Sequence, residues 1–194
     1  MSVILFLFAA IPVLIVAFGL WAALAYNKLV ALRNRSIGAW SDIDVQLKRR
    51  HDLVGNLVDA VESYSDYESE TLQAVVEARQ VATGAVAAGD AAAAGVAEAV
   101  LGRRLGSLMA VVEDYPDLKA NQNYLDLQRQ LGGLEDALQS ARRYYNAVVR
   151  DFNTRIQSLP DVLIARAAGF SERSYFELDD PGEAAAPQVG RGGA

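Results

Sequence analysis

An uncharged apolar run at the N-terminus, residues 3–26, is the most prominent pattern in the sequence. The first charged side chain after it is that of Lys28. At a rise of about 1.5 Å per residue, a helix of this length reaches roughly 36 Å, enough to cross a hydrocarbon core of about 30 Å. The run predicts a membrane-spanning helix, and we assign residues 1–27 to a transmembrane anchor. The anchor residues that we single out are Val3, Phe8, Pro12, Phe18, Trp21 and Tyr26.

Three features distinguish this run from a cleaved secretory signal. Only Met1 and Ser2 precede it, neither of them is basic, and the run is longer than a typical signal core. Trp21 and Tyr26 occupy the zone where small residues would mark a cleavage site, and they form a typical interfacial aromatic pair. We therefore interpret the run as an uncleaved anchor.

Basic residues follow the anchor directly and predict its orientation. Lys28, Arg33 and Arg35 come first, and no acidic residue appears until Asp42. By the positive-inside rule, the C-terminal side is expected in the cytoplasm and Met1 outside, in a single-pass protein of the cell membrane. These three bases are also better placed to meet lipid phosphates than the later basic run Lys48-Arg49-Arg50.

Beyond the anchor, apolar positions continue at steps of three and four with one step of seven, the spacing of a helix that faces a core. They are Trp40, Ile43, Leu47, Val54, Leu57, Val61 and Tyr64. Because nothing breaks the helix after Tyr26, the pattern predicts one helix from the membrane to about Tyr64. Asp66 is a candidate cap for the next helix.

Two shorter helices are predicted next. The first follows a stripe over 72–86, and the glycine at the centre of Ala88-Gly89-Asp90 indicates a turn after it. The second follows a stripe over 96–112. It ends at Tyr115-Pro116-Asp117, because a proline disfavours a helical residue before it.

The clearest pattern beyond the anchor predicts a long last helix from about Leu118 to Ser158. Its apolar positions step by threes and fours until Leu159-Pro160 stops the helix. A short helix over 161–169 is expected next, followed by a disordered tail over 179–194 that is rich in Gly, Ala and Pro. We predict an all-α chain in which the transmembrane helix continues into an up-and-down four-helix bundle over 28–178, with long first and last helices.

Composition excludes several functional classes. The chain has no cysteine, so it has no disulfide framework, thiolate metal site or cysteine nucleophile. A net charge of −6 argues against general binding of nucleic acid, which needs clustered bases. The charge is uneven: residues 28–50 hold six bases against two acids, whereas residues 51–98 hold nine acids against one base.

Four segments together resemble one known family. They are AWSDIDVQLKRRHDLVGNLV (39–58), YPDLKANQNYLDLQ (115–128), ARRYYNAVVRDFNTRIQSLP (141–160) and GFSERSYFE (169–177). In this order they are similar to the LemA family. The resemblance implies a membrane-anchored, cytoplasmic, up-and-down four-helix bundle, and it brings no established activity, cofactor or catalytic residue. The chain departs from the family pattern at His51, where an aromatic is usual, and at Gly55, where proline is frequent.

Candidate catalytic or metal chemistry is scarce. A di-iron site in a four-helix bundle needs Glu-x-x-His pairs on two helices, but His51 is the only histidine and no glutamate precedes it by three. Because His51 lies in the charged run 48–52, we expect it to be solvated or salt-bridged. The sequence contains no phosphate-binding glycine motif. We therefore expect no cofactor, no metal, no small-molecule substrate and no enzymatic activity.

Several polar groups are candidates for contact with partners. Lys48-Arg49-Arg50 offers charges to an anionic partner or to lipid, although an ordinary solvated face explains it as well. The segment 59–70 holds five acids and no base, so it is either a solvated face or a contact for the basic region of a second copy. Its candidate residues include Glu62, Asp66, Glu68 and Glu70.

Tyr144 and Tyr145 are adjacent on the last helix, so they cannot face the same way. One is expected to pack inward, and the other is available to a partner. Asn146 and Asn153 lie beside the apolar stripe, where they fix helix register or take part in a peptide-binding surface.

These observations favour a non-enzymatic, membrane-anchored scaffold that assembles with itself and organises or shapes the membrane. Small residues over 78–99 permit the close approach of helices that such assembly needs. The alternative is an adaptor or signalling accessory that presents its helices to a membrane enzyme or protease.

Overall fold

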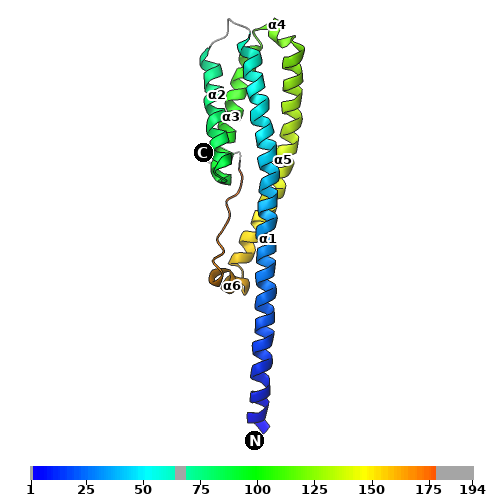
Figure 1. Ribbon diagram of the computed structural model, residues 1–194, viewed down its shortest axis with the longest axis vertical. Coiled ribbons are helices and arrows are strands. Elements are labelled where there is room, and N and C mark those ends of the chain that lie inside the picture. Colours follow the sequence, from blue (N-terminus) through cyan, green and yellow to red (C-terminus); the bar gives the residue numbers. More distant parts are fainter. Residues whose placement is uncertain (1, 64–68, 178–194) are drawn as a thin grey trace, which may run out of the picture. The chain divides into compact units, whose positions relative to one another are not determined.

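The computed structural model describes residues 2–63 and 69–177, with the side chains of 10–63 and 70–177. All regular elements in this part of the chain are helices, which confirms the all-α class (Figure 1). The helices are α1 (Ser2–Glu62), α2 (Ser69–Ala87), α3 (Ala91–Val112), α4 (Pro116–Lys119), α5 (Gln122–Gln157) and α6 (Asp161–Ala167).

Helix α1 runs without a break from the apolar run into the charged region that follows it. It contains Pro12 and ends at Glu62, two residues before the predicted end at Tyr64. The prediction of one continuous helix is therefore confirmed. The predicted cap at Asp66 lies outside the described residues.

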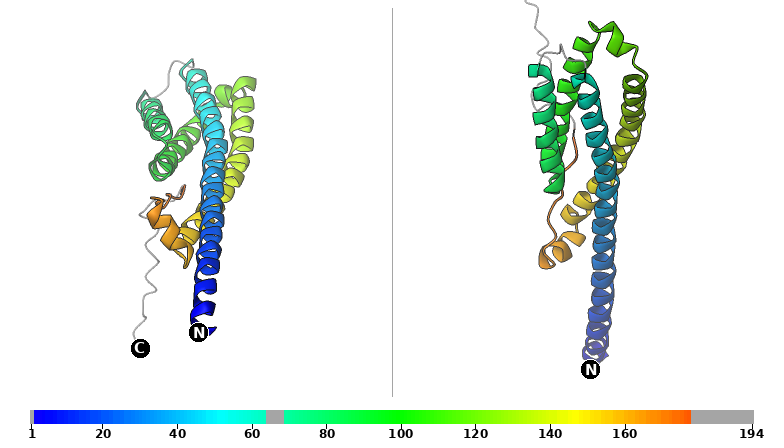
Figure 2. Two further views of the ribbon diagram at one scale, coloured as in Figure 1. Left: turned by 60° about the horizontal axis from the view of Figure 1, so that its bottom comes forward. Right: turned by 45° about the horizontal axis from the view of Figure 1, so that its top comes forward.

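The turn between α2 and α3 is where the sequence predicts it. Gly89 has a φ of +70°, a left-handed conformation that glycine adopts without steric cost. The Asp90 carboxylate then accepts hydrogen bonds from the backbone N–H groups of Ala92 and Ala93 at 3.0 and 3.1 Å, which caps α3. As a result, α2 and α3 lie side by side and antiparallel (Figures 1 and 2).

The corner before α5 is more elaborate than predicted. Pro116 opens a one-turn helix, α4, and the long last helix begins at Gln122 rather than at Leu118. The Asn121 side chain accepts hydrogen bonds from the backbone N–H groups of Asn123 and Tyr124, so a second cap starts α5 four residues late. Helix α5 then continues to Gln157, and α6 follows as expected.

The chain divides into two compact units, Met1–Ala39 with Tyr144–Arg173 and Trp40–Arg143 with Ser174–Ala194, here called the first and the second unit. The core of the first unit consists of side chains from α1, α5 and α6. They are Leu29, Leu32, Phe152, Ile156 and Ala165, with Ile164 and Phe170 packed against them.

The core of the second unit is larger and is shared by α1, α2, α3, α4 and α5. Its fully buried members include Val54, Leu57, Val61, Val75, Ala82, Leu101 and Leu108. Small residues are frequent on α2 and α3. There Ala78, Ala82 and Ala97 occupy core positions, whereas α1 contributes larger side chains to the same core. This allows the backbones of α2 and α3 to approach closely.

The segment 171–177, which follows α6, has no helical structure, and the sequence pattern does not predict its packing. Within the second unit, Phe176 is fully buried, and its ring lies 5.8 Å from that of Trp40 in an edge-on arrangement. A Cβ atom added to Gly95 would lie 2.0 Å from the carbonyl oxygen of Glu177. The end of the segment, at Glu177, therefore lies directly on α3, where only glycine leaves room for its backbone.

Candidate functional site

Over its described side chains, from residue 10 onward, the apolar run of α1 exposes most of its large hydrophobic groups. Val16, for example, is 70% exposed. The helix is the one described element that is long and apolar enough to cross a membrane, and its most apolar window has a mean hydropathy of 1.8. Of the predicted anchor residues, Pro12 and Phe18 are exposed, whereas Val3 and Phe8 lie outside the described side chains.

The two interfacial aromatic residues of the predicted anchor both contact other rings. Trp21 lies 5.3 Å from the ring of Phe18, and Tyr26 lies 5.9 Å from that of Phe170. Phe170 follows α6, so within the first unit a segment distant in sequence covers the C-terminal end of the apolar run. The basic residues Lys28, Arg33 and Arg35 that follow it are exposed.

The basic triplet 48–50 does not form one surface. Lys48 is exposed and pairs with Asp44 one helical turn away, at 2.7 Å, and Arg49 is exposed. Arg50 instead turns into the second unit, where its guanidinium lies 3.0 Å from a Glu135 carboxylate oxygen and 3.7 Å from one of Glu98. Its side chain is only 11% exposed, which leaves little of it for a partner.

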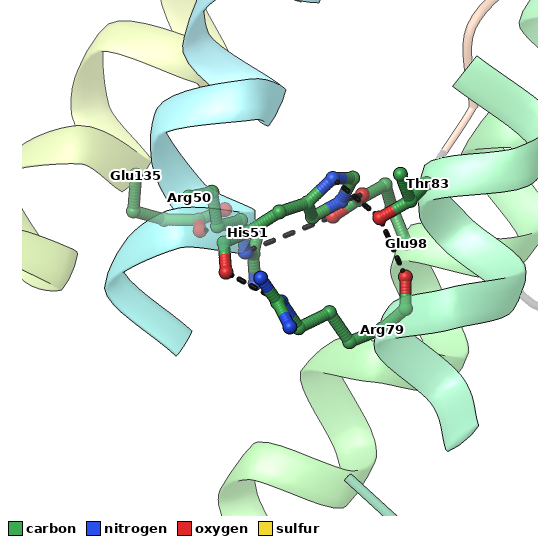
Figure 3. A network of polar contacts seen from close by, with 6 residues as sticks. All are labelled: Arg50, His51, Arg79, Thr83, Glu98 and Glu135. Atoms are coloured by element: carbon green, nitrogen blue, oxygen red, sulfur yellow. Dashed lines mark hydrogen bonds and ion pairs between the residues drawn. The ribbon is translucent and has the colours of Figure 1, made fainter. Parts of the chain in front are cut away.

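His51 is buried rather than solvated. Its Nε2 atom lies 2.6 Å from Oε1 of Glu98, whose side chain is fully buried (Figure 3). Of the two expectations for this histidine, the structure supports the salt-bridged one. The sequence did not reveal the partner, because Glu98 lies 47 positions away in an alanine-rich helix.

The second ring nitrogen of His51 is also engaged. Its Nδ1 atom lies 3.1 Å from Oγ1 of Thr83, and that hydroxyl donates to the carbonyl oxygen of Arg79 at 2.8 Å. Because the hydroxyl has one proton, it accepts from Nδ1–H of His51 when it donates to Arg79. The Nε atom of Arg79 donates to the backbone carbonyl of His51 at 2.6 Å, which completes the network in Figure 3.

This network connects four helices. Arg50 and His51 come from α1, Arg79 and Thr83 from α2, Glu98 from α3 and Glu135 from α5. Its polar atoms face one another, and the described part of the chain contains no group of three potential metal ligands. The arrangement is chemically suited to hold helices in register rather than to bind a substrate.

The remaining predicted contact residues have varied environments. Glu62 and Glu70 are exposed, whereas Asp66 and Glu68 lie outside the described residues. Tyr144 is 51% exposed and Tyr145 is 3% exposed, so the two tyrosines do face opposite ways. Asn146 is partly buried.

Asn153 is buried, and its amide forms two hydrogen bonds within the first unit. Its nitrogen donates to the carbonyl oxygen of Arg173, and its oxygen accepts from the backbone N–H of the same residue, both at 2.9 Å. Asn153 therefore fixes the chain that follows α6, and its amide is not available to a peptide partner.

An apolar groove of about 420 Å³ lies between α2 and α3 in the second unit. It is lined by Ala78, Val81, Ala85, Ala93, Val96, Ala97 and Val100. Two apolar side chains of this lining are open to solvent: Val81 is 65% exposed and Val96 is 46% exposed. The small-residue segment 78–99 predicted from the sequence provides most of this groove.

Comparison with known proteins gives one family. A model of the LemA family matches residues 39–190. Magnetosome protein MamQ of Magnetospirillum gryphiswaldense is 27% identical over 201 aligned residues, which cover 91% of this chain and 74% of that protein. Magnetosome protein MamQ 2 of Paramagnetospirillum magneticum is 27% identical over 192 residues, or 87% and 71% of the two chains. Protein LemA of Metamycoplasma hominis is 28% identical over 154 residues, or 79% and 69%.

Proposed function

Because the chain belongs to the LemA family, we propose that it is a non-enzymatic, membrane-anchored helical scaffold that assembles with itself in the cell membrane. In this proposal α1, which is apolar and long enough to cross a membrane, supplies the anchor. The longer helices that share the core of the second unit, α1, α2, α3 and α5, would form an up-and-down four-helix bundle in the cytoplasm. The relatives are named both as magnetosome proteins and simply as LemA, so we propose a function that does not depend on magnetosomes.

The apolar groove on α2 and α3 is the observation that favours self-assembly. An isolated exposed valine is ordinary on a protein surface, but Val81 and Val96 lie on the two walls of one apolar depression. Around a two-fold axis, the valines of one copy would enter the alanine-lined hollow of the next. Small residues let two helix pairs approach closely enough for this packing.

The molar mass of the full chain in detergent tests the proposal. We expect an oligomer for the natural sequence and a smaller species for the double variant Val81→Glu/Val96→Glu, because two carboxylates would be desolvated in the contact. Val45→Glu is the matched control, since Val45 is 58% exposed on α1 and does not line the groove. A natural sequence that remains monomeric at micromolar concentration and at every salt concentration would refute self-assembly.

The topology has its own test. The chain contains no cysteine, so a single introduced one is a unique label. We expect a membrane-impermeant maleimide to label Ser2→Cys in intact cells, and Ser140→Cys only after the membrane is opened. The reverse pattern would contradict the proposed orientation.

The half-exposed Tyr144 favours an adaptor as the second candidate function. An exposed tyrosine beside a buried one is suited to an interface, because its ring is apolar and its hydroxyl is polar. A photo-crosslinker at Tyr144 and another at Val81, each in the full chain in cells, distinguish the two functions. Self-crosslinks from Val81 support the scaffold, whereas one dominant foreign partner at Tyr144 supports the adaptor.

A further inference from the structure

A cleft of about 780 Å³ lies in the first unit, between α1 and the C-terminal end of α5. Trp21, Lys28, Leu32 and Arg35 line it from α1, and Arg150, Asp151, Thr154 and Arg155 line it from α5. Ser158, Leu159, Pro160 and Asp161, which follow the last residues of α5, complete the lining. No sequence pattern indicates this cleft, because its two walls are more than a hundred residues apart.

The cleft has an excess of positive charge. Four of its lining residues are basic, and two are acidic. Of the two acids, Asp161 is buried and already pairs with Arg155 at 2.6 Å. Three bases then face the single remaining acid, Asp151, and within the described residues Lys28, Arg35 and Arg150 form no ion pair or side-chain hydrogen bond.

The basic residues of α1 also form one stripe with an aromatic residue. Trp21, Lys28 and Arg35 are spaced by seven residues, so they lie two turns apart on one face of the helix, about 10.5 Å from each to the next. The stripe begins inside the apolar run and ends outside it. A molecule bound along it would contact an indole at one end and cations at the other. Lipids at the membrane interface are likewise contacted by aromatic and by basic side chains.

We propose that this cleft binds the phosphate-bearing headgroup of an anionic membrane lipid. The cations of Lys28, Arg35 and Arg150 contact the phosphate, and the Thr154 hydroxyl is within the same lining to donate to it. The acyl chains lie along the exposed apolar surface of α1 that precedes Lys28, where Leu20 and Leu24 are 63% and 62% exposed. A free phosphate ion would use only the cationic end.

The inference rests on the proposed membrane anchor, but it assigns a site that anchoring does not need. Helix α1 is apolar enough to insert without any headgroup contact. Binding at the cleft would instead select anionic lipid and fix which face of α1 and α5 meets the headgroups. If the lipid site proved wrong, the proposed anchoring and self-assembly would still stand, because they have separate tests. Vesicle flotation tests anchoring, and molar mass tests self-assembly.

Native mass spectrometry of the full chain in a nonionic detergent tests the site. We expect retention of phosphatidylglycerol over phosphatidylcholine. We also expect a loss of about fivefold in affinity for each charge removed by Arg35→Gln or Arg150→Gln. Arg33→Gln is the matched control, because Arg33 is exposed on the same helix but does not line the cleft. It should change the affinity by less than about twofold.

Asp151→Asn provides a test in the opposite direction. It removes the one unpaired acid of the cleft, so it should tighten phosphatidylglycerol binding, and a variant that gains affinity cannot have lost its fold. Equal losses from Arg33→Gln and Arg35→Gln would show a general attraction of charges and overturn the site. Displacement of the lipid by inorganic phosphate at equal concentration would show a free-anion site and overturn the lipid assignment.

Discussion

The carboxylate of Glu98 on α3 lies 2.6 Å from the imidazole of His51 on α1, and both side chains are buried in the second unit. The same carboxylate also faces the guanidinium of Arg50 at 3.7 Å. One fully buried carboxylate is therefore shared by an imidazole and a guanidinium from a neighbouring helix. Removing it leaves both without their buried partner, which is far more costly than losing a surface pair.

Substitution of this anion is expected to destabilise the protein. Glu98→Ala should lower the free energy of unfolding by about 3–5 kcal/mol, because it removes the buried partner of the His51 imidazole and of the Arg50 Nε atom. Thermal unfolding of the full chain in detergent, followed by circular dichroism, measures the change. Glu135→Ala is the control, since Glu135 pairs with Arg50 but is 52% exposed, and it should cost less than about 1 kcal/mol. Equal costs for the two variants would contradict a special role for the buried carboxylate.

Gly95→Ala should release the segment that lies on α3. The new methyl group would meet the Glu177 carbonyl at 2.0 Å, so this backbone has to move away. We expect faster amide hydrogen exchange over residues 174–177, and reduced burial of Phe176. The control is Gly106→Ala on the same helix, where nothing lies within 4 Å of the added group. That variant should leave exchange unchanged and gain up to about 1 kcal/mol in helix propensity.

Asn153→Ala should free the chain that follows α6 in the first unit. The substitution removes two hydrogen bonds of 2.9 Å and leaves the backbone of Arg173 without its partner. The expected cost is about 1–3 kcal/mol, with increased proteolysis between Phe170 and Arg173. Gln139→Ala, at an exposed position on α5, should stay within about 0.5 kcal/mol of the natural sequence. If Asn153→Ala changed neither the stability nor the rate of proteolysis, other contacts would have to hold this segment.

The stability of the protein should fall at alkaline pH because of Tyr124. Burial raises the pKa of its phenol above the usual 10.0, and the carboxylate of Glu113 adds to this effect. The unfolded chain therefore loses its proton at lower pH than the folded one. The stabilising contribution is complete below about pH 10 and is lost as the pH rises through the folded pKa.

The variant Tyr124→Phe tests this pH dependence. It cannot ionise at this position, so its unfolding midpoint should decline less steeply above about pH 10 than that of the natural sequence. Near neutral pH it loses the contact of 2.9 Å from the Tyr124 hydroxyl to the sulfur of Met109, which predicts a small destabilisation there. If the unfolding midpoints of the two proteins declined equally steeply above about pH 10, the assignment to Tyr124 would be contradicted.

The helices could largely be predicted from sequence because their signals are local. Apolar spacing located α1, α3 and α5, and Gly89 with Asp90 located the turn between α2 and α3. Where two local signals compete, the prediction was less accurate. Pro116 begins a single turn of helix, but Asn121 then caps a new one, so α5 starts later than the apolar stripe suggests.

Pairings between distant residues could not be predicted in this way. His51 and Arg50 stand in a charged run that is typical of a solvated face, and Glu98 stands among alanines. The packing of α1 with α2, α3 and α5 removes these side chains from water. Likewise, Phe176 is one aromatic residue in a segment without periodicity, and its burial depends on a place on α3 that only a glycine leaves open.

The network around Glu98 also bears on how such chains can be recombined. An exchange of α3 alone between related proteins would set Arg50 and His51 of one parent against whatever the other parent has at position 98. A functional hybrid would have to inherit α3 together with residues 50–51 of α1. Exchange points for hybrid proteins therefore belong outside the stretch 50–98, and those within it should lower stability wherever the two parents differ at positions 50, 51 or 98.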